Sequence, residues 1–334
     1  MIKVAHLLDD FAMGGVTRAL NLFEQPSLAA KGESRVMPVD PGASLAPSID
    51  ADLIVDHMAL SWRRISFLLS LRLRNPSARI VHVEHSYTRN FEVDQVASQG
   101  RFRAMLKIAS MLVDKFICVS DAQRDWLLTD VKLPPYKLTR IYPWSGRFEL
   151  NAIGAGAPRK GRPLRLLAYG RFAEIKNFAE LVLAMRNFAT DEVELTLFGD
   201  GPDRERLAKL AEPLTHVKIL PPTQEITGHL AACDAVIVPS RREAFGLVAT
   251  EARMAGRAVL AADSDGLPEQ VGNAGLVAPM KTEQDIAAAI RLALKVPTAQ
   301  MGEMGRQEVA SQHDRILDEW LYVFKVAARK AGKI

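Results

Sequence analysis

The sequence predicts an α/β protein made of two doubly wound, Rossmann-like domains that face each other across a cleft. Its 334 residues exceed the usual size of one domain and suit two. Short apolar runs alternate with segments of helical periodicity, which is typical of a parallel sheet with helices on both faces. A stretch rich in Gly, Ala and Pro, Asn151–Pro163, interrupts this alternation, which then restarts. Two such halves leave a cleft, the usual place for a ligand.

The first half contains six short apolar runs that predict strands. These are Ile2–Leu8, Arg35–Val39, Leu53–Asp56, Arg79–Glu84, Lys115–Ser120 and Leu138–Tyr142. Helical spacing predicts helices at Val16–Ala30, Ser61–Leu73, Arg101–Val113 and Asp121–Leu128. Ser120 and Asp121 are good capping residues for the last of these helices. Tyr87–Gly100 has no clear period, and we expect a loop there.

The second half repeats the pattern. We expect strands at Leu164–Ala168, Glu192–Phe198, His216–Leu220, Asp234–Ser240, Ala258–Ala261 and Gly275–Ala278. The predicted helices are Phe178–Met185 with Asn177 as its cap, Arg204–Ala211, Glu225–Ala232, the segment after Gly246, Asp285–Leu294, and one or two long helices within Met301–Ala328. The segment Gly266–Glu269 is expected to form a loop or the start of a short helix.

The composition is that of a globular enzyme, with 48% hydrophobic and 25% charged residues. Cys118 and Cys233 lie in apolar runs, so we expect buried thiols in a reducing compartment. No Cys/His set has zinc-site spacing, and no apolar run approaches the ~20 residues that span a bilayer. The N-terminus lacks the features of a signal peptide. We therefore expect a cytoplasmic protein, at most peripheral on the inner face of the membrane.

The net charge of +4 is unevenly distributed. The stretch Trp62–Lys115 holds ten Lys or Arg residues against four acidic residues, and it includes two apolar and basic segments with helical spacing. One interpretation is two helices that pack on a sheet with their basic faces in water. The other is a surface for anionic lipid or an anionic acceptor. No nucleic-acid-binding motif is present, so nucleic acid is not an expected partner.

Three features of the first half are candidate ligand contacts. Gly14 and Gly15 follow the first strand and open a helix that carries Arg18, an arrangement that suits a phosphate. The pair lacks the GxGxxG spacing of a dinucleotide site, and a plain tight turn explains it equally well. His57 and His85 follow strands at their carboxyl ends, where ligands bind to an open parallel sheet. His6 and His82 lie inside strands, where we expect core or edge positions.

The stretch Arg241–Gly256 is the clearest candidate site of the second half. It follows a buried strand and carries two carboxylates, Glu243 in a loop and Glu251 on the helix that follows. Gly246 between them allows close approach of the backbone to a ligand. The helix N-terminus offers unpaired N–H groups and a partial positive charge to a phosphate. The unit can therefore hold a phosphorylated sugar, with amides for the phosphates and carboxylates for the hydroxyls.

These motifs together resemble the nucleotide-sugar-binding domain of the retaining GT-B glycosyltransferases of family 4, the group 1 glycosyltransferases. The resemblance covers about residues 164–280 and lies in the order of four motifs: Gly170-Arg171 with Lys176-Asn177, the turn Gly199-Asp200-Gly201-Pro202, the pair Glu243 and Glu251, and Gly266–Glu269 followed by Gly275-Leu276-Val277. The first half resembles the family more loosely, through Gly14-Gly15, His57, His85 and the segment ICVSDAQRDWL. Tyr142-Pro143-Trp144-Ser145 departs from the family's Asn-Gly-x-Asp turn.

The resemblance implies roles for individual residues. Arg171 and Lys176 would bind the donor pyrophosphate and stabilise the charge on the leaving nucleotide. Glu243 would lie at the donor sugar, Glu251 would accept hydrogen bonds from the ribose hydroxyls, and His85 would contact the sugar near the reacting carbon. The implied catalytic residues are His85, Arg171, Lys176 and Glu243. The other implied donor contacts are Gly14, Gly15, Gly170, Gly199, Ala244, Phe245, Gly246, Leu247 and Glu251, and a weaker implication places Arg18 and His57 at the acceptor.

The implied activity is that of a hexosyltransferase. It would move a sugar from a nucleotide-diphosphate sugar to a glycan or lipid-linked acceptor, with retention of anomeric configuration, in polysaccharide, lipopolysaccharide or glycolipid synthesis. The family needs no metal or other cofactor. A nucleotide-sugar epimerase or phosphorylase on the same fold, or a non-catalytic nucleotide-sugar-binding module, is the alternative. A dehydrogenase is disfavoured because no GxGxxG with a downstream acid follows a strand.

The domain boundaries expected from these patterns are as follows. Residues 1–148 form the acceptor-side domain, 149–163 the linker and 164–312 the nucleotide-sugar-binding domain. Residues 313–334 form a final helix that the fold usually sends back to the N-terminal domain. Trp320, Tyr322 and Phe324 are candidates for its packing residues.

Overall fold

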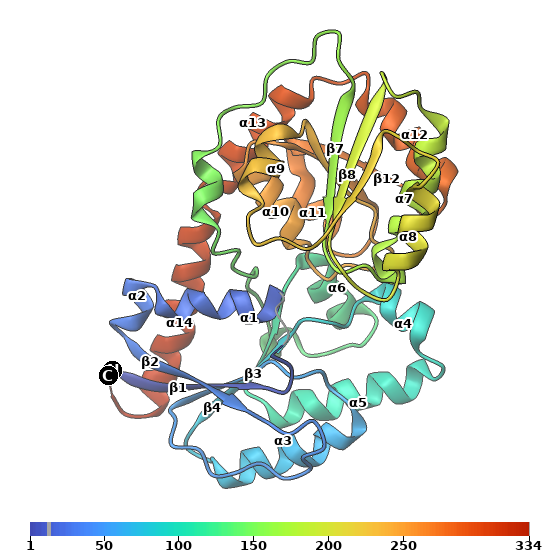
Figure 1. Cartoon of the computed structure of the whole chain (residues 1–334). Helices are drawn as coiled ribbons and strands as arrows, with labels where there is room; N and C mark the ends of the chain where they lie inside the picture. The colour runs from blue at the N-terminus through green and yellow to red at the C-terminus, as the bar shows by residue number, and fades with distance from the viewer. Residues whose placement is uncertain (12–14, 334) are drawn as a thin grey trace. The chain divides into compact units, whose positions relative to one another are not determined.

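The computed structural model describes residues 1–11 and 15–333, which form two compact units (Figure 1). Unit 1 comprises residues 1–146 and 313–334, and unit 2 comprises residues 147–312. Each unit contains one six-stranded sheet in which every strand pairing is parallel. The two doubly wound α/β domains that the alternating pattern predicts are therefore present.

The sheet of unit 1 has the strand order β2-β1-β3-β4-β5-β6. Its strands are β1 (Ile2–Leu8), β2 (Gly32–Pro38), β3 (Leu53–Asp56), β4 (Arg79–Glu84), β5 (Lys115–Cys118) and β6 (Leu138–Arg140). The chain adds β2 on one side of β1 and β3 on the other. The strand order therefore reverses between β1 and β3, the position at which doubly wound sheets bind ligands.

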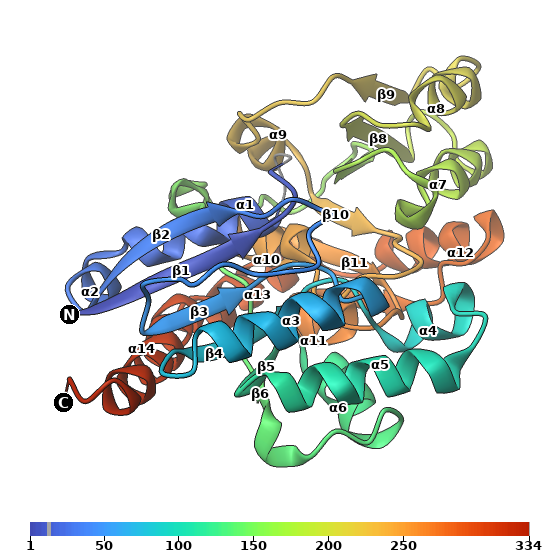
Figure 2. The same cartoon turned by 90° about the horizontal axis from the view of Figure 1, so that it is seen from below.

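Helices cover both faces of this sheet (Figures 1 and 2). They are α1 (Gly15–Ala19), η1 (Leu20–Glu24), α2 (Pro26–Ala29), α3 (Trp62–Arg74), α4 (Arg89–Gln95), α5 (Gln99–Leu112), α6 (Asp121–Thr129), η2 (Pro135–Lys137) and α14 (Gln312–Lys330). Figure 2 shows α3 and α5 side by side on one face. As predicted, Ser120 caps α6 by accepting a hydrogen bond from the Gln123 amide.

Two predictions for unit 1 were wrong. The single helix expected over Val16–Ala30 is three short segments, because Gln25 is extended and Pro26 cannot donate a backbone hydrogen bond. The loop expected over Tyr87–Gly100 contains α4. The Thr88 side chain caps this helix by accepting from the Phe91 amide, and the helix buries Glu92. The capping threonine is a local signal for a helix start, but the stretch has no clear hydrophobic period, so the pattern did not predict the helix.

Helix α14 packs within unit 1 through aromatic side chains. The ring of Trp320 meets that of Phe23 edge to face at 4.8 Å, and Phe324 is 3% exposed. A Cβ on Gly32 would lie 2.7 Å from the Phe324 ring, so this glycine lets the helix approach the sheet. Tyr322, which we expected to pack, is 67% exposed because it lies on the opposite side of the helix from this contact.

The sheet of unit 2 has the order β12-β11-β10-β7-β8-β9. Its strands are β7 (Leu164–Tyr169), β8 (Val193–Phe198), β9 (Val217–Leu220), β10 (Ala235–Val238), β11 (Ala258–Ala262) and β12 (Gly275–Ala278). The order reverses between β7 and β10. Every residue of β10 and β11 is buried, as expected for central parallel strands with both faces covered.

The helices of unit 2 also lie on both faces of its sheet, with α7, α8 and α12 on one side and α9, α10 and α13 on the other (Figure 1). They are η3 (Phe148–Ala152), η4 (Glu174–Lys176), α7 (Phe178–Ala184), η5 (Met185–Asn187), α8 (Arg204–Ala211), α9 (Thr227–Ala232), α10 (Leu247–Met254), α11 (Leu267–Val271), η6 (Gly272–Ala274), α12 (Glu283–Ala293) and α13 (Thr298–Val309). The stretch expected to be a linker includes η3, whose Leu150 is buried in the core of unit 2.

Two expectations from the composition concern the state of the cysteines and the presence of membrane-spanning helices. Cys118 and Cys233 are free thiols and both are buried. Burial raises the pKa of the Cys233 thiol to about 12, so it stays protonated and unreactive at neutral pH. Among the described residues, no helix combines the length and the apolar character needed to cross a membrane.

Candidate functional site

Lys176 and Glu243 form an ion pair where the strand order of unit 2 reverses. The Lys176 Nζ lies 2.5 Å from Glu243 Oε2. Lys176 ends the short turn η4 after β7, and Glu243 lies in the loop after β10, so the adjacent carboxyl ends of β7 and β10 bring the two residues together. Both side chains are partly exposed, at 26% and 20%. The pair is therefore open to a ligand that competes for either charge.

The loop that carries Glu243 is held by hydrogen bonds from its neighbours. Ser240 Oγ donates to Glu243 Oε2 at 3.2 Å, and the Glu243 amide donates to Asp265 Oδ2 at 3.3 Å. The Gly266 amide donates to the Glu243 carbonyl at 3.0 Å. These bonds tie the loop after β10 to the loop after β11. The position of the Glu243 carboxylate is thus fixed by the tertiary structure.

Two glycines allow the loops after β7 and β8 to touch. A Cβ on Gly199 would lie 1.9 Å from the Gly170 carbonyl oxygen, closer than any side chain allows. Gly199 also has φ of +153° and Gly170 has φ of +139°. The two motif glycines therefore have structural functions: Gly199 lets one backbone pack directly on another, and Gly170 adopts a positive φ that other residues rarely do.

Helix α10 begins beside Glu243 and has no side-chain cap. Its N-cap residue is Gly246, with φ of +100°, and a Cβ there would lie 2.5 Å from a Leu267 side-chain carbon. Phe245 is 3% exposed and anchors the turn, whereas Ala244 and Leu247 are half-buried. The helix N-terminus can therefore offer amide groups and a partial positive charge to an anion.

Glu251 is buried in this structure, with 1% of its surface exposed. The Tyr169 hydroxyl, at the end of β7, donates to Glu251 Oε2 at 2.6 Å. The Arg147 Nε lies 3.5 Å from Oε1 of the same carboxylate. The sequence pattern singled out Glu251 but neither of these partners, because nothing local marks Arg147 or Tyr169. A ribose at Glu251 would have to share the carboxylate with them.

Arg171 is exposed and makes no ion pair or hydrogen bond with the residues that the structure describes. It follows Gly170 directly after β7. Asn177, expected to cap α7, is at the N-cap position in the left-handed conformation, but its side chain donates to the Met280 carbonyl at 2.7 Å instead. That expectation was wrong, because burial of Asn177 directs its amide to the core.

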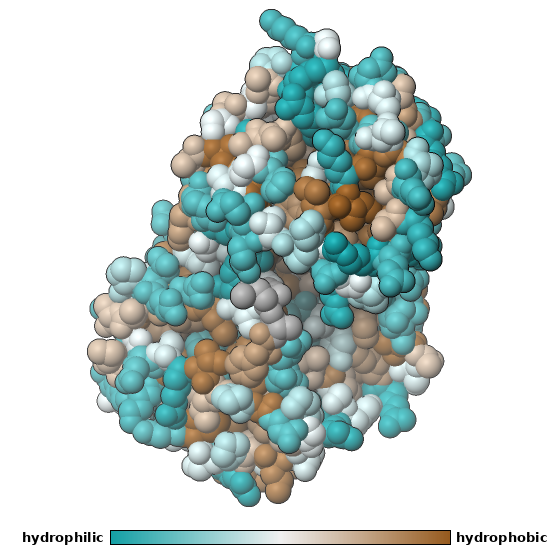
Figure 3. Space-filling model, viewed as in Figure 1, coloured by the Kyte–Doolittle hydropathy of each residue, from teal (hydrophilic) through white to brown (hydrophobic). Residues whose placement is uncertain are grey.

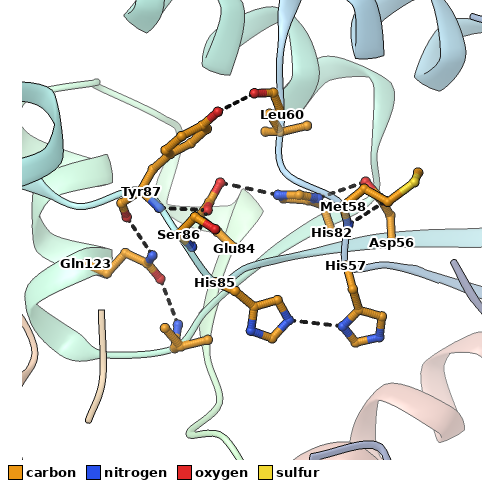
Figure 4. Close-up of polar contacts among 11 residues, drawn as sticks. Asp56, His57, Met58, Leu60, His82, Glu84, His85, Ser86, Tyr87 and Gln123 are labelled. Atoms are coloured by element: carbon orange, nitrogen blue, oxygen red, sulfur yellow. Dashed lines mark hydrogen bonds and ion pairs between the residues drawn. The ribbon is translucent and has the colours of Figure 1, made fainter. Parts of the chain in front are cut away.

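His57 and His85 lie together in unit 1 at the ends of β3 and β4 (Figure 4). His57 Nδ1 is 3.0 Å from His85 Nε2. Burial lowers the pKa of His57 well below its ordinary value and that of His85 to about 4. Both rings are therefore neutral at physiological pH. A cavity of about 30 Å³ beside them is lined by Leu20, Trp144 and Trp320, among others.

A buried cluster of three charged groups supports the backbone at His85 (Figure 4). His82 lies between Asp56, at 2.9 Å, and Glu84, at 3.4 Å. Although burial opposes the charge, the hydrogen bonds to these carboxylates raise the pKa of His82 to about 9. Glu84 Oε1 also accepts from the amides of Ser86 and Tyr87, each at 2.9 Å. The turn that follows His85 is therefore pinned by a buried imidazolium and its carboxylates.

His6 extends the histidine pair into a row of three. Its Nδ1 lies 3.1 Å from His57 Nε2, and it is 1% exposed. We expected only a core or edge position for His6. The signal that could have found it is topological, since β1 and β3 are adjacent on either side of the point where the strand order reverses.

The remaining predicted residues lie at the start of unit 1. Gly14 is outside the described residues. Gly15 begins α1, and Arg18 lies in the last turn of that helix, half-buried. The structure thus brings together Lys176 with Glu243, and His57 with His85, and places Glu251 with Tyr169 and Arg147.

Comparison with known proteins finds a family model that matches the second half of the chain. Residues 155–308 match the family model described as glycosyl transferases group 1. The MMP alpha-(1->4)-mannosyltransferase of Mycolicibacterium hassiacum is 26% identical over 255 residues, which are 71% of this chain and 59% of that protein. The matched region thus spans less than two thirds of the length of that relative.

Two solved structures share the fold of the whole chain. HepE of Anabaena, solved in complex with UDP and glucose, has a TM-score of 0.76 at 17% identity, covering 97% of this chain and all of that one. WaaG, a glycosyltransferase involved in lipopolysaccharide biosynthesis, has a TM-score of 0.66 at 17% identity and covers 94% and 98% of the two chains. At this identity the likeness establishes the GT-B fold and nothing finer.

Proposed function

We propose that this protein transfers a hexose from a nucleotide-diphosphate sugar to a glycan or lipid-linked acceptor. The premise of this proposal is the match of residues 155–308 to the group 1 glycosyl transferases. The ion pair of Lys176 with Glu243 is the observation that carries this proposal. Arg171, an unpartnered cation among the described residues, follows the same strand as Lys176, and the uncapped N-terminus of α10 follows Glu243 in the chain. These three features can bind a diphosphate, and a carboxylate is at hand for the sugar attached to it.

The charges of the pair suggest how the donor binds. In the free protein, Lys176 and Glu243 neutralise each other. A diphosphate has more negative charge than one carboxylate and takes over the lysine. Glu243 is then released to accept hydrogen bonds from sugar hydroxyls, and Ser240 still holds one of its oxygens. Donor binding thereby replaces the ion pair by an ion pair of Lys176 with the diphosphate and by hydrogen bonds from hydroxyl groups to the Glu243 carboxylate.

The same cations act on the leaving group. As the bond from the anomeric carbon to the phosphate oxygen breaks, negative charge develops on the departing diphosphate. Arg171 and Lys176 stabilise this charge. The acceptor oxygen bonds to the anomeric carbon on the same face, and its proton passes to the departing phosphate oxygen. This step retains the anomeric configuration and requires neither a metal nor a protein base, and we propose both features for this enzyme.

Other residues are assigned to the substrates. Glu251 binds the ribose hydroxyls after its contacts with Tyr169 and Arg147 rearrange. His85 contacts the donor sugar near the reacting carbon. We assign Gly15 and the amides of Ala244–Leu247 to the phosphates and the sugar, and Arg18 and His57 to the acceptor. The complexes of structural neighbours with UDP and UDP-glucose support a nucleotide-sugar donor.

Replacement of Lys176 tests the proposal. We expect Lys176→Ala to reduce donor turnover, including hydrolysis without acceptor, by about 100-fold, because one cation at the leaving group is lost. Lys209→Ala, at an exposed position on α8, is the matched control. UDP, GDP and ADP and their sugars are compared by thermal shift, since a ligand that binds only the folded chain raises Tm. Undiminished turnover in Lys176→Ala would refute the role at the pyrophosphate.

We also propose that the enzyme works in the cytoplasm at an anionic membrane surface. Helix α3 exposes Leu69 at 47% and Leu73 at 70%, and Arg63 on the same helix and Lys107 on α5, which packs against α3, are exposed cations. Figure 3 shows apolar and polar residues intermingled on one face of the molecule. Exposed leucines beside basic side chains suit insertion among anionic lipids. This supports a lipid-linked acceptor, as in lipopolysaccharide or glycolipid synthesis.

Vesicle sedimentation tests the membrane proposal. Binding should increase with the fraction of anionic lipid and fall several-fold when Leu69 and Leu73 are both replaced by serine. The control is Tyr136→Ser, because Tyr136 is 70% exposed but lies in η2, outside this surface. Binding that ignores the lipid charge would contradict the proposal.

A further inference from the structure

The three histidines of unit 1 form a single row. His6 Nδ1 is 3.1 Å from His57 Nε2, and His57 Nδ1 is 3.0 Å from His85 Nε2. The ring planes are 29° and 21° from parallel, and the ring centroids are 5.4 and 5.3 Å apart. Centroids this far apart, with nitrogens this close, mean that the rings meet edge to edge. Each shared proton therefore lies in the plane of both rings, the best direction for a hydrogen bond.

The geometry of the row does not suit a shared metal ion. A row of edge-to-edge rings points each nitrogen at the next ring and not at a common centre, and the described residues contain no metal-binding cluster of three or more His, Cys, Asp or Glu. The neighbouring His82 belongs to a different network, since Asp56 and Glu84 occupy its two nitrogens.

A neutral imidazole carries one N–H donor and one acceptor nitrogen. Burial lowers the pKa of all three rings, to about 3 for His6 and about 4 for His85. With both hydrogen bonds intact, the donors must all point the same way along the row. Either every ring is protonated at Nδ1, or every ring is protonated at Nε2. A mixed arrangement would place two donors or two acceptors against each other.

From this geometry we propose that His6 and His57 are positioning residues that set which nitrogen of His85 carries the proton. If all rings are protonated at Nδ1, His85 offers its outer nitrogen as a donor. If all are protonated at Nε2, it offers an acceptor. We infer that the surroundings of His6 Nε2, at the far end of the row, decide between these states. This nitrogen is buried and has no hydrogen-bond partner among the described residues. This inference rests on the proposed function only for the use to which His85 is put.

The tautomers can be read directly in the full-length protein without any ligand. Long-range proton–nitrogen correlation spectra of the ¹⁵N-histidine-labelled chain show which nitrogen of each ring is protonated. Single substitutions of the seven histidines assign the signals. We expect His6, His57 and His85 to be neutral and protonated at the same nitrogen, and His82 to be protonated at both, as an internal reference. Unlike tautomers within the row would overturn the proposal.

A substitution at the far end tests the coupling. His6→Leu removes the terminal ring without touching His85, and we expect the ratio of the His85 tautomers to change at least about threefold. His6→Val serves if His6→Leu does not fold. Phe23→Leu is the matched control, because Phe23 packs on the His6 ring at 4.2 Å and contributes no nitrogen, so the ratio should stay unchanged. An unchanged ratio in a folded His6 variant would contradict the coupling.

Activity provides an independent readout. In the proposed transferase, His6→Leu should lower kcat about tenfold and leave KM for the donor nearly unchanged, because the orientation of a proton changes and no binding group is lost. A common tautomer in the spectra without any sugar transfer would leave the row established and would refute the proposed function. A normal kcat with a shifted tautomer would refute the role of His85 in the reaction.

Discussion

Gly199 shows how one residue determines the edge of the candidate donor site. The backbone after β8 passes so close to the Gly170 carbonyl that no side chain fits at Gly199, and its φ of +153° is unfavourable for other residues. The motif therefore serves the packing of two loops, whatever it contributes to a ligand. The same is true of Gly201, where a Cβ would lie 2.4 Å from the Phe172 carbonyl oxygen.

We expect Gly199→Ala to lower the free energy of unfolding by about 2–3 kcal/mol, since both backbone strain and a clash with backbone oppose the methyl group. Urea denaturation measures the change. Gly228→Ala is the control, because Gly228 lies in α9 with no atom near the added Cβ, and alanine there should be neutral or stabilise by up to about 1 kcal/mol. Equal stabilities for the two variants would contradict the predicted clash.

At the scale of elements, α14 shows how a chain end becomes part of a distant core. Trp320 and Phe324 are buried on one side of the helix, against Phe23 and the start of β2. Ion pairs flank this contact, with Glu319 at 3.3 Å from Arg140 and Lys330 at 3.6 Å from Asp114. These ion pairs are partly exposed and add little stability compared with the aromatic contact.

We expect Phe324→Ala to destabilise unit 1 by about 3–5 kcal/mol, the usual cost of deleting a buried phenyl ring. Tyr322→Ala, on the exposed side of the same helix, should change stability by less than about 0.5 kcal/mol. Urea unfolding of both variants checks the prediction. A comparable loss in Tyr322→Ala would show that helix propensity, and not aromatic packing, holds α14.

For the molecule as a whole, buried histidines make stability depend on pH in both directions. The pKa of His82 is about 9 in the folded chain, above its ordinary value of 6.5. Its contribution is complete below pH 6.5 and is lost as the pH rises towards 9, because only the folded state keeps the proton. The pKa of His6 is lowered to about 3, so the folded state loses stability as the pH falls below 6.5.

We therefore expect the free energy of unfolding to fall by about 1 kcal/mol per pH unit between pH 7 and 9 through His82 alone. His82→Gln should remove this slope, whereas His216→Gln should keep it, because the His216 ring hydrogen-bonds to an uncharged group, the Met185 carbonyl. Urea titrations at several pH values measure the slopes. Parallel curves for wild type and His82→Gln would contradict the assigned imidazolium.

Much of the architecture follows from local patterns. The buried apolar runs of β7, β10 and β11 predict parallel strands, because such strands lose contact with water on both faces. Lys176 and Glu243 are identifiable for a related reason: residues that follow parallel strands gather at one edge of the sheet. Short caps and breaks, as at Thr88 and Pro26, act over single turns and leave no mark in the hydrophobic periodicity.

By itself the sequence determined the alternation of strands and helices, the order of the motifs and the residue types available to bind a sugar nucleotide. Only the tertiary structure decided which of these residues meet. The contact of Lys176 with Glu243 spans 67 positions, and that of His6 with His57 spans 51. Both depend on which strands are neighbours, and strand order follows from the packing of the whole sheet rather than from local pattern. The burial of Glu251 by Tyr169 and Arg147 has the same origin, since contacts between distant segments exist only once the core has formed.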